Sequence, residues 1–428
     1  MTTQGPVRRA IRNAGWLMAG KGTGGVFSLV YIALAARSLG VEQFGVFALI
    51  LSYGQAVSNL AQFQSWQSVV RYGAVHHLEN QPARLRRILN FSTLLDLGAA
   101  SVGALLGVIG ALVIGPYLGW SDQEQLLALF FSLSVMFGLR GTPTGILRLF
   151  DRFDLAAYSE TVLPTMRLLG ALIAWAMGAS IIGYLIVWAA AELISTVAMW
   201  WAALREVHRQ DLRVGEGSRL RGVVAENPGL WRFAWSTNFN TSVSLIWKQL
   251  PVLVVGWAVN AVAAGGFRIA ANLVGALNKP AVMLARAMYP ELAKLAVTER
   301  GRVARVVRKV TVVAAGVGVL AVILMAVFGK LALHLIGGEA YIFAYPFLLV
   351  LSVAAAIELC GVAVEPAMIA LGRPGTVLLA RSVTGIFYAG VLIWLANAWG
   401  AIGAATAAIV GAIFMLIMLF GLFMRAIR

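Results

Sequence analysis

The chain is poor in cysteine, histidine and acidic residues. Its 428 residues include one cysteine, four histidines and 18 Asp and Glu residues. The single thiol, Cys360, excludes an intramolecular disulfide framework. The histidines are His76, His77, His208 and His334. They lack the helical spacing of a metal site, so no metal ion is expected.

The sequence also lacks the residue patterns of an enzyme. No loop carries paired carboxylates, a Ser-His-Asp set or metal ligands. The segment from Gly15 to Lys21 imitates the glycine and lysine spacing of a phosphate-binding loop. Gly22 then stands where that loop needs Ser or Thr to hold Mg²⁺. We therefore expect neither an enzyme nor a bound cofactor.

Long apolar runs are abundant instead. Hydrophobic residues make up 60% of the chain and charged residues 12%. The apolar blocks are about 18–24 residues long, and about 20 apolar residues cross the hydrocarbon core as a helix. The sequence thus predicts an all-α polytopic membrane protein with about twelve transmembrane helices. The predicted spans are 14–36, 44–69, 91–114, 123–139, 156–178, 182–203, 233–257, 262–285, 310–329, 341–366, 377–396 and 402–424.

The charges lie mostly in the connections on one side of these spans. The formal net charge is +16, and 26 of the 34 Lys and Arg residues fall on one predicted membrane face. The opposite face has only Arg37 and Lys330. Such an asymmetry follows the positive-inside rule and predicts that both termini are cytoplasmic. The basic excess is then a topology signal, and no nucleic-acid partner is expected.

The chain divides into two halves that resemble each other. The longest connection, 204–232, is charged and separates six predicted helices from six. We predict an N-terminal six-helix lobe at 1–203, a linker at 204–232 and a C-terminal six-helix lobe at 233–428. Gly45-Val46-Phe47 matches Gly265-Gly266-Phe267 at an offset of 220 residues. Halves with an even number of helices enter the membrane from the same side, which predicts a parallel repeat.

Four predicted helices, 14–36, 44–69, 233–257 and 262–285, carry polar residues at helical spacing. Arg268, Asn272, Gly275 and Lys279 step by four, three and four residues, which places them on one helical face. These four helices contain four lysines and arginines but no Asp or Glu. Cations in a bilayer normally face partners or water, so we predict a hydrated cationic cavity. The residues predicted to bind substrate there are Lys21, Lys248, Arg268, Lys279, Asn272, Thr241, Gln55 and Asn59.

The intramembrane acids permit two interpretations. Glu192 and Glu358 are candidates for ion coupling, because a buried acid can relay H⁺ or bind Na⁺. A structural hydrogen bond is the alternative for both. Arg167 could pair with Glu160 or Glu192, and Glu365 with Arg381; the positions of these residues allow such pairs without any role in transport.

Several short segments resemble a known family. They are Ala36–Gly40 followed by Phe44–Phe47, then Leu371–Pro374 and Trp399–Ala405. With them the chain resembles the multidrug/oligosaccharidyl-lipid/polysaccharide (MOP) exporter superfamily, in its polysaccharide transporter and O-antigen flippase branch. The resemblance implies two six-helix lobes that form a V around a central cavity. It also implies that cavity cations bind a pyrophosphate, for which Lys21 and Arg268 are counterparts by location.

These expectations converge on a flippase in the bacterial inner membrane. Its expected cargo is an oligosaccharide on a polyprenyl pyrophosphate, moved by alternating access for O-antigen or exopolysaccharide synthesis. The expected partners are this anionic lipid-linked oligosaccharide, membrane lipids, H⁺ or Na⁺, and polysaccharide assembly enzymes. The alternatives are a cation-coupled multidrug exporter of the same fold and a membrane-embedded glycan polymerase or ligase. A drug exporter would more often carry acids in its cavity, where they bind cationic drugs. A polymerase or ligase needs catalytic residues on a sizeable outer loop.

Overall fold

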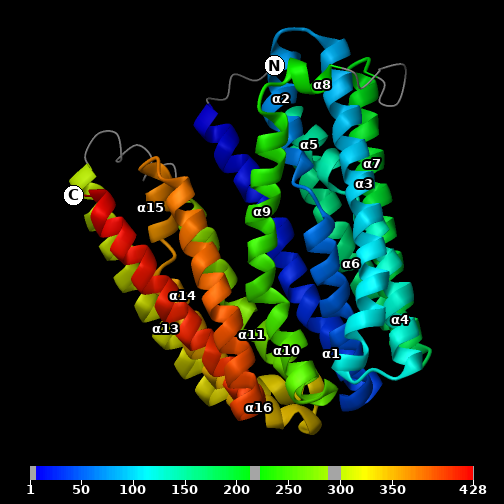
Figure 1. The fold of residues 1–428 in the computed structure, drawn as a ribbon, viewed down its shortest axis with the longest axis vertical. Coiled ribbons are helices and arrows are strands. Elements are labelled where there is room, and N and C mark those ends of the chain that lie inside the picture. The colour runs from blue at the N-terminus through cyan, green and yellow to red at the C-terminus, as the bar shows by residue number, and fades with distance from the viewer. Residues whose placement is uncertain (1–5, 213–221, 288–299, 428) are drawn as a thin grey trace. The chain divides into compact units, whose positions relative to one another are not determined.

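The computed structural model describes residues 6–212, 222–287 and 300–427, and within them all regular structure is helical (Figure 1). The α-helices of the first half are α1 (Pro6–Ala61), α2 (Ser65–Leu78), α3 (Pro82–Ile114), α4 (Asp122–Leu133), α5 (Gly141–Leu149), α6 (Phe153–Ala176) and α7 (Ile181–Arg209). Those of the second half are α8 (Val223–Glu226), α9 (Leu230–Lys248), α10 (Leu250–Ala258), α11 (Ala261–Ala287), α13 (Arg300–Gly337), α14 (Tyr345–Cys360), α15 (Val364–Ala370) and α16 (Pro374–Ile427). Short 3-10 turns are η1 (Pro116–Leu118), η2 (Ser134–Gly138) and η3 (Glu339–Ala344). The expected all-α fold class is confirmed.

The predicted spans lie almost entirely in helical residues, but short breaks at residues 62–64, 249 and 361–363 interrupt the spans 44–69, 233–257 and 341–366. α1 and α16 each contain two spans, separated by kinks at Gly40 (φ 73°) and Gly400 (φ 62°). Seven helical stretches are long and apolar enough to cross a membrane. They contain eight of the predicted spans in full and residues 24–36 of the span 14–36. The remaining spans lie in α6, in α9 with α10, and in α11. Of these helices, α6 carries Arg167 together with Glu160, and these charges lower its mean hydropathy.

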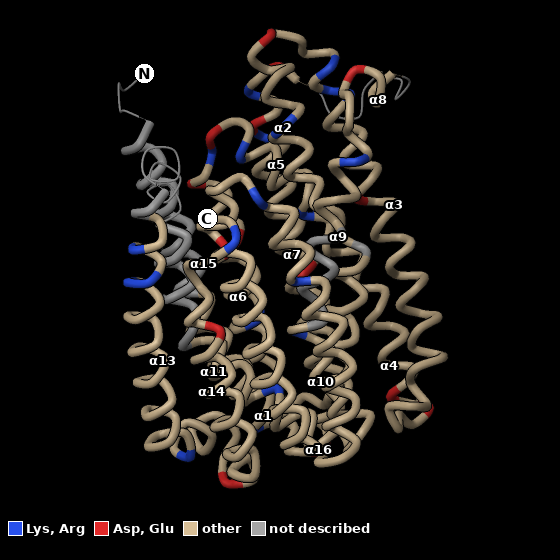
Figure 2. Tube along the Cα trace, turned by 60° about the vertical axis from the view of Figure 1, so that its left-hand side comes forward, with Lys and Arg blue, Asp and Glu red and all other residues tan. Residues whose placement is uncertain are grey.

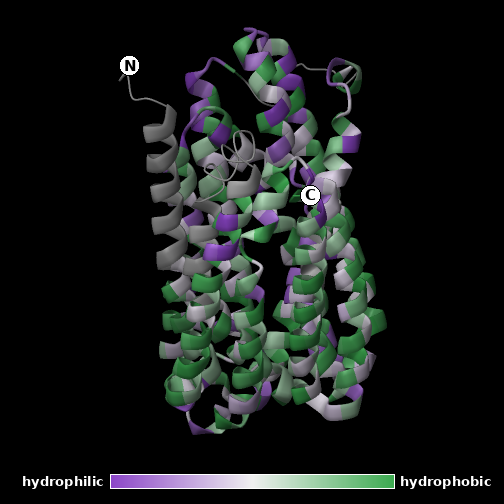
Figure 3. Ribbon diagram, turned by 90° about the vertical axis from the view of Figure 1, so that its left-hand side faces the viewer, coloured by the Kyte–Doolittle hydropathy of each residue, from purple (hydrophilic) through white to green (hydrophobic). Residues whose placement is uncertain are grey.

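The helices group into two compact units. Unit 1 comprises residues 1–38 and 50–245, and unit 2 comprises residues 39–49 and 246–428. In both, apolar residues dominate the helix middles (Figure 3). The division at 204–232 and the V-shaped placement of two lobes around a cavity stay predictions.

The end of the long connection packs on unit 1. Glu226 pairs with Arg87 through bonds of 2.6 and 2.9 Å, and Asn227 contacts the buried His76 at 2.9 Å. Val223 and Leu230 are buried in a core with α2, α3, α5 and α7. These contacts explain why unit 1 extends into α9.

Left-handed turns recur at the offset expected for the repeat. The three pairs of residues with positive φ are Gly119 and Gly338, Asp151 and Gly372, and Gly178 and Gly400, at separations of 219, 221 and 222 residues. Such φ values are unusual outside glycine, so their recurrence is informative. The positions support the internal repeat predicted from the sequence.

The fourth predicted helix of each half is interrupted at matching places. In unit 1 the helical hydrogen bonding stops at Leu139 and Arg140, before α5, and in unit 2 a turn separates Cys360 from Val364. The freed backbone in unit 1 finds partners on α7. Thr196 donates to the carbonyl of Phe137, and Trp200 donates to that of Leu139 at 2.8 Å. Non-helical backbone is tolerated at membrane depth only where the protein satisfies it in this way.

Asp96 of α3 fixes the start of α5 from the other side. Its carboxylate accepts hydrogen bonds of 2.7 Å from the backbone N–H and the hydroxyl of Thr142. Gly141 allows this approach, because a Cβ there would lie 2.0 Å from Ser65 Oγ and 2.9 Å from both Asp96 oxygens.

Gly141→Ala is therefore expected to destabilise unit 1. The methyl group overpacks a buried polar contact, at a cost of about 1–3 kcal/mol. Gly98→Ala on α3 is the matched control, since nothing lies within 4 Å of its Cβ position. Thermal unfolding in detergent should show a lower midpoint for Gly141→Ala only; equal midpoints for both variants would contradict the packing.

Candidate functional site

The break between α9 and α10, which lies in unit 2, carries the first polar group of the candidate site. α9 ends at Lys248 and α10 begins at Leu250, with Gln249 between them. Pro251 follows, and because proline has no N–H it cannot continue the helical hydrogen bonding. Lys248 is exposed, whereas the Gln249 side chain is buried. Discontinuous helices of this kind form substrate sites in many transporters.

Arg268 of α11 reaches this break. Its Nη1 donates to Gln249 Oε1 at 3.0 Å, and the residue is half-buried. One helical turn later, Asn272 has a buried Nδ2 without a hydrogen-bond partner among the described residues. Arg268, Asn272 and the α9–α10 break thus form a donor-rich group within unit 2.

The other predicted binding residues are placed less completely. Lys21, Thr241 and Lys279 lie on α1, α9 and α11, but their side chains lie outside the described residues. Gln55 and Asn59 are half-buried on α1, in unit 1. A single cavity lined by all of these residues stays a prediction.

Glu192, a candidate for ion coupling, is held by two arginines. Its Oε1 lies 2.6 Å from Arg167 Nη2, and its Oε2 pairs with Arg140 Nη2. The Arg167–Glu192 pair considered from the sequence is confirmed. The span predicted at 123–139 ends just before Arg140, which the structure places at the break between η2 and α5. Both carboxylate oxygens of Glu192 are thus engaged, which disfavours Glu192 as a free acid for ion coupling.

Glu358, the other coupling candidate, lies near an aromatic pair. Its side chain is exposed and acts electrostatically on Tyr388 of α16. Tyr388 stacks on Trp247, with ring centroids 4.4 Å apart and planes 4° apart. The expected Glu365–Arg381 pair is also confirmed, with bonds of 2.6 and 2.8 Å.

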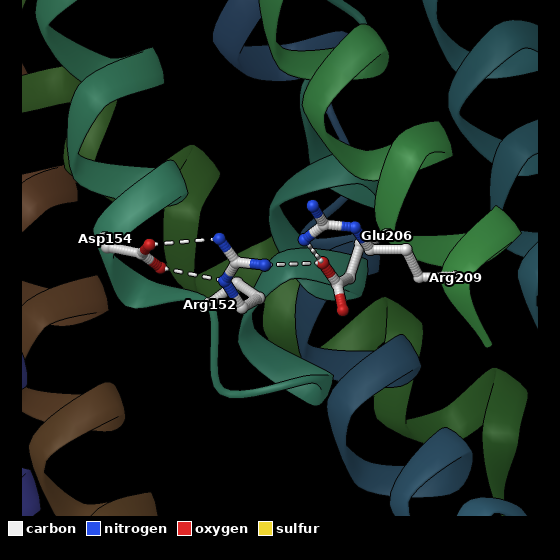
Figure 4. Close-up of polar contacts among 4 residues, drawn as sticks. All are labelled: Arg152, Asp154, Glu206 and Arg209. Atoms are coloured by element: carbon white, nitrogen blue, oxygen red, sulfur yellow. Dashed lines mark hydrogen bonds and ion pairs between the residues drawn. The ribbon is translucent and has the colours of Figure 1, made fainter.

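Charged residues gather at the α2–α8 end of unit 1, and the helix middles hold few (Figure 2). Arg152, between α5 and α6, bonds Asp154 at 3.1 Å and Glu206 at 2.7 Å (Figure 4). Arg209 also contacts Glu206, at 3.5 Å. Hydrogen bonds from Arg152 hold the pKa of Asp154 below its ordinary value. This cluster fastens α6 to α7 and is structural.

Sequence reasoning did not find Gln249, Arg140 or the Trp247–Tyr388 pair. Pro251 could have indicated the break beside Gln249, because proline inside an apolar span interrupts its hydrogen bonding. Arg140 was grouped with the charges of the connections because the predicted span 123–139 ends one residue before it. Nothing in the sequence alone indicates that Trp247 meets Tyr388.

The fold agrees with the comparisons. The chain resembles an inward-facing multidrug resistance transporter of the MATE family in the MOP superfamily, with a TM-score of 0.74 at 12% identity, covering 96% of this chain and 95% of that one. It also resembles the lipid II flippase MurJ in an inward closed conformation, with a TM-score of 0.73 at 13% identity, covering 96% and 89% of the two chains. The molecule therefore has the fold of a MOP superfamily transporter.

The sequence matches place it more narrowly. Residues 10–296 match the family described as polysaccharide biosynthesis protein. The inner membrane protein YghQ of Escherichia coli (strain K12) is 32% identical over 346 residues, which cover 80% of this chain and 96% of YghQ. The chain belongs to the polysaccharide biosynthesis protein family.

Proposed function

We propose that the protein is a flippase for an oligosaccharide linked to a polyprenyl pyrophosphate. It would move this cargo across the inner membrane for surface polysaccharide synthesis, O-antigen or exopolysaccharide. YghQ is named an inner membrane protein and MurJ a lipid II flippase, and both support this choice. The loop charges support a topology with both termini in the cytoplasm.

The observation that carries the proposal is the position of Arg268. A guanidinium on a membrane helix is costly unless it has a function or a partner. One of its contacts is with the neutral amide of Gln249, which accepts a hydrogen bond from Arg268 Nη1 and orients the guanidinium at the helix break. Arginine binds phosphate oxygens in bidentate fashion, so the group suits an anionic lipid head.

Alternating access supplies the movement. Lys248 and Arg268 lie toward the outer ends of their predicted helices, and Lys21 and Lys279 toward the inner ends, by a rise of about 1.5 Å per residue. Two inner and two outer cations could pass a pyrophosphate across as the transporter changes state. H⁺ or Na⁺ would be the coupling ion, and assembly enzymes would supply the cargo.

A cation-coupled drug exporter is the alternative with the same fold. Acids that could attract a cationic drug are absent from the four polar helices of the sequence. Glu192 is already engaged by two arginines, which disfavours it as a free acid. A glycan polymerase or ligase is disfavoured by the short predicted outer segments.

Reconstitution into vesicles tests the proposal. A fluorescent polyprenyl-pyrophosphate oligosaccharide should move between leaflets only when the protein is present, as read by leaflet-selective quenching. A cationic dye should not be transported. Dye transport without movement of the lipid-linked glycan would refute the proposal in favour of the drug exporter.

A further inference from the structure

Unit 1 holds a second cationic group, which the proposed function does not use. Arg140, at the break before α5, and Arg167 of α6 share the carboxylate of Glu192 on α7. We call these three residues the Arg-Glu-Arg trio. The side chains of Arg140, Glu192 and Arg167 are 26%, 22% and 14% exposed, so they are neither at the surface nor sealed in the core.

The fold does not need charges at these positions. An offset of 221 residues, within the range set by the repeated turns, maps the trio onto Gly361, Tyr388 and Ile413 of unit 2. None of these mates is charged, and Tyr388 stacks on Trp247 instead. Because the second repeat forms the same helix break without charges, the trio is not required to build it.

Charges that the fold does not require are costly at this depth. A buried ion pair seldom offsets the loss of hydration of its members. The trio is costlier still, since one carboxylate serves two guanidinium groups. Such a group is retained for function more readily than for stability, which makes the trio a candidate binding site.

The trio also has hydrogen-bond donors that could bind an anion. The Nε atoms of Arg140 and Arg167 are buried and have no hydrogen-bond partner among the described residues. Two further acids lie near the trio. Asp96 accepts from Thr142. Glu160 lies 4.0 Å from Arg148, whose guanidinium lies over Trp66, and it also acts electrostatically on Arg140.

We propose that the Arg-Glu-Arg trio binds the carboxylate of an acidic sugar in the cargo. Glu192 acts as an internal counter-ion. It pairs with both arginines before the sugar binds, and one of these ion pairs is replaced by a pair with the sugar carboxylate. The arginines already hold one planar carboxylate, with each oxygen on a different guanidinium, so a sugar carboxylate matches this geometry. The sugar identity rests on the proposed function, whereas anion binding by the trio does not.

Binding of glucuronate to the purified full-length protein tests this proposal. Ligand-detected NMR in detergent should show binding of glucuronate and none of glucose. Glu192→Gln keeps the size of the side chain but removes the competing charge. The variant should bind glucuronate about tenfold more tightly, because no carboxylate at position 192 competes with the ligand for the two arginines. Arg167→Gln should abolish the binding.

Glu365→Gln is the matched control, since Glu365 also pairs with an arginine on a membrane helix. It should leave glucuronate affinity unchanged. Weaker binding in Glu192→Gln, in a protein that keeps its thermal midpoint, would overturn the proposal. So would binding of pyrophosphate in place of glucuronate. These results are independent of vesicle transport, so failure of the trio and failure of the flippase proposal are distinguishable.

Discussion

Replacing Arg268 by alanine is expected to reduce export of the lipid-linked glycan by about 30-fold or more. A hydrogen bond to a charged group contributes about 2 kcal/mol, which corresponds to a rate factor of that size. The variant leaves Gln249 at the helix break without its guanidinium partner. Arg268→Lys should be intermediate, because lysine keeps the charge but loses the planar fork. Surface glycan in a complemented deletion strain measures the effect.

Lys330→Ala is the control for this experiment. Lys330 is exposed, and its Nζ lies 5.2 Å from the Tyr345 ring centroid, so its loss should change export little. Lys21→Ala should behave like Arg268→Ala if both cations contact the pyrophosphate. Normal glycan export by both Arg268→Ala and Lys21→Ala would exclude the transfer of the pyrophosphate between the inner and outer cations. It would not contradict the fold.

The fold was predictable because membrane spans are encoded locally. A run of apolar residues of membrane length has few alternatives to a helix, so the predicted spans are mostly helical and only short breaks interrupt them. The kinks at Gly40 and Gly400 fall in the short connections between spans, which the sequence indicated by their glycines. Local composition was therefore enough to predict most of the secondary structure.

The candidate site was less predictable because it depends on contacts between helices. Arg268 was found by its spacing, but its partner Gln249 belongs to another helix and has no periodic signal. Arg140 was missed because the sequence placed the end of a helix where the structure has an interruption. The Glu365–Arg381 pair was found because opposite charges in apolar surroundings have few other partners. Pairs of charges were thus easier to foresee than amides or aromatic rings.

Glycine at position 45 marks a place where backbones approach closely within unit 2. A Cβ on Gly45 would lie 2.2 Å from the carbonyl oxygen of Ala261 and 2.5 Å from its carbon. Gly265, its mate at the predicted repeat offset of 220, faces it. A Cβ on Gly265 would lie 3.0 Å from the Gly45 Cα. Small residues let membrane helices pack at such distances, so the matched glycines noted in the sequence have a packing function.

Gly45→Ala is therefore expected to destabilise the protein by about 3 kcal/mol, at the upper end of the usual cost of overpacking. The added methyl group meets backbone atoms, which cannot rotate away as a side chain can. Gly390→Ala on α16 is the matched control, since nothing lies within 4 Å of its Cβ position. We expect Gly45→Ala to lower both the thermal midpoint and the yield of monodisperse protein, and Gly390→Ala to preserve them. If the two variants were equally stable, the close approach of residues 39–49 to α11 would be wrong, and with it the assignment of this segment to unit 2.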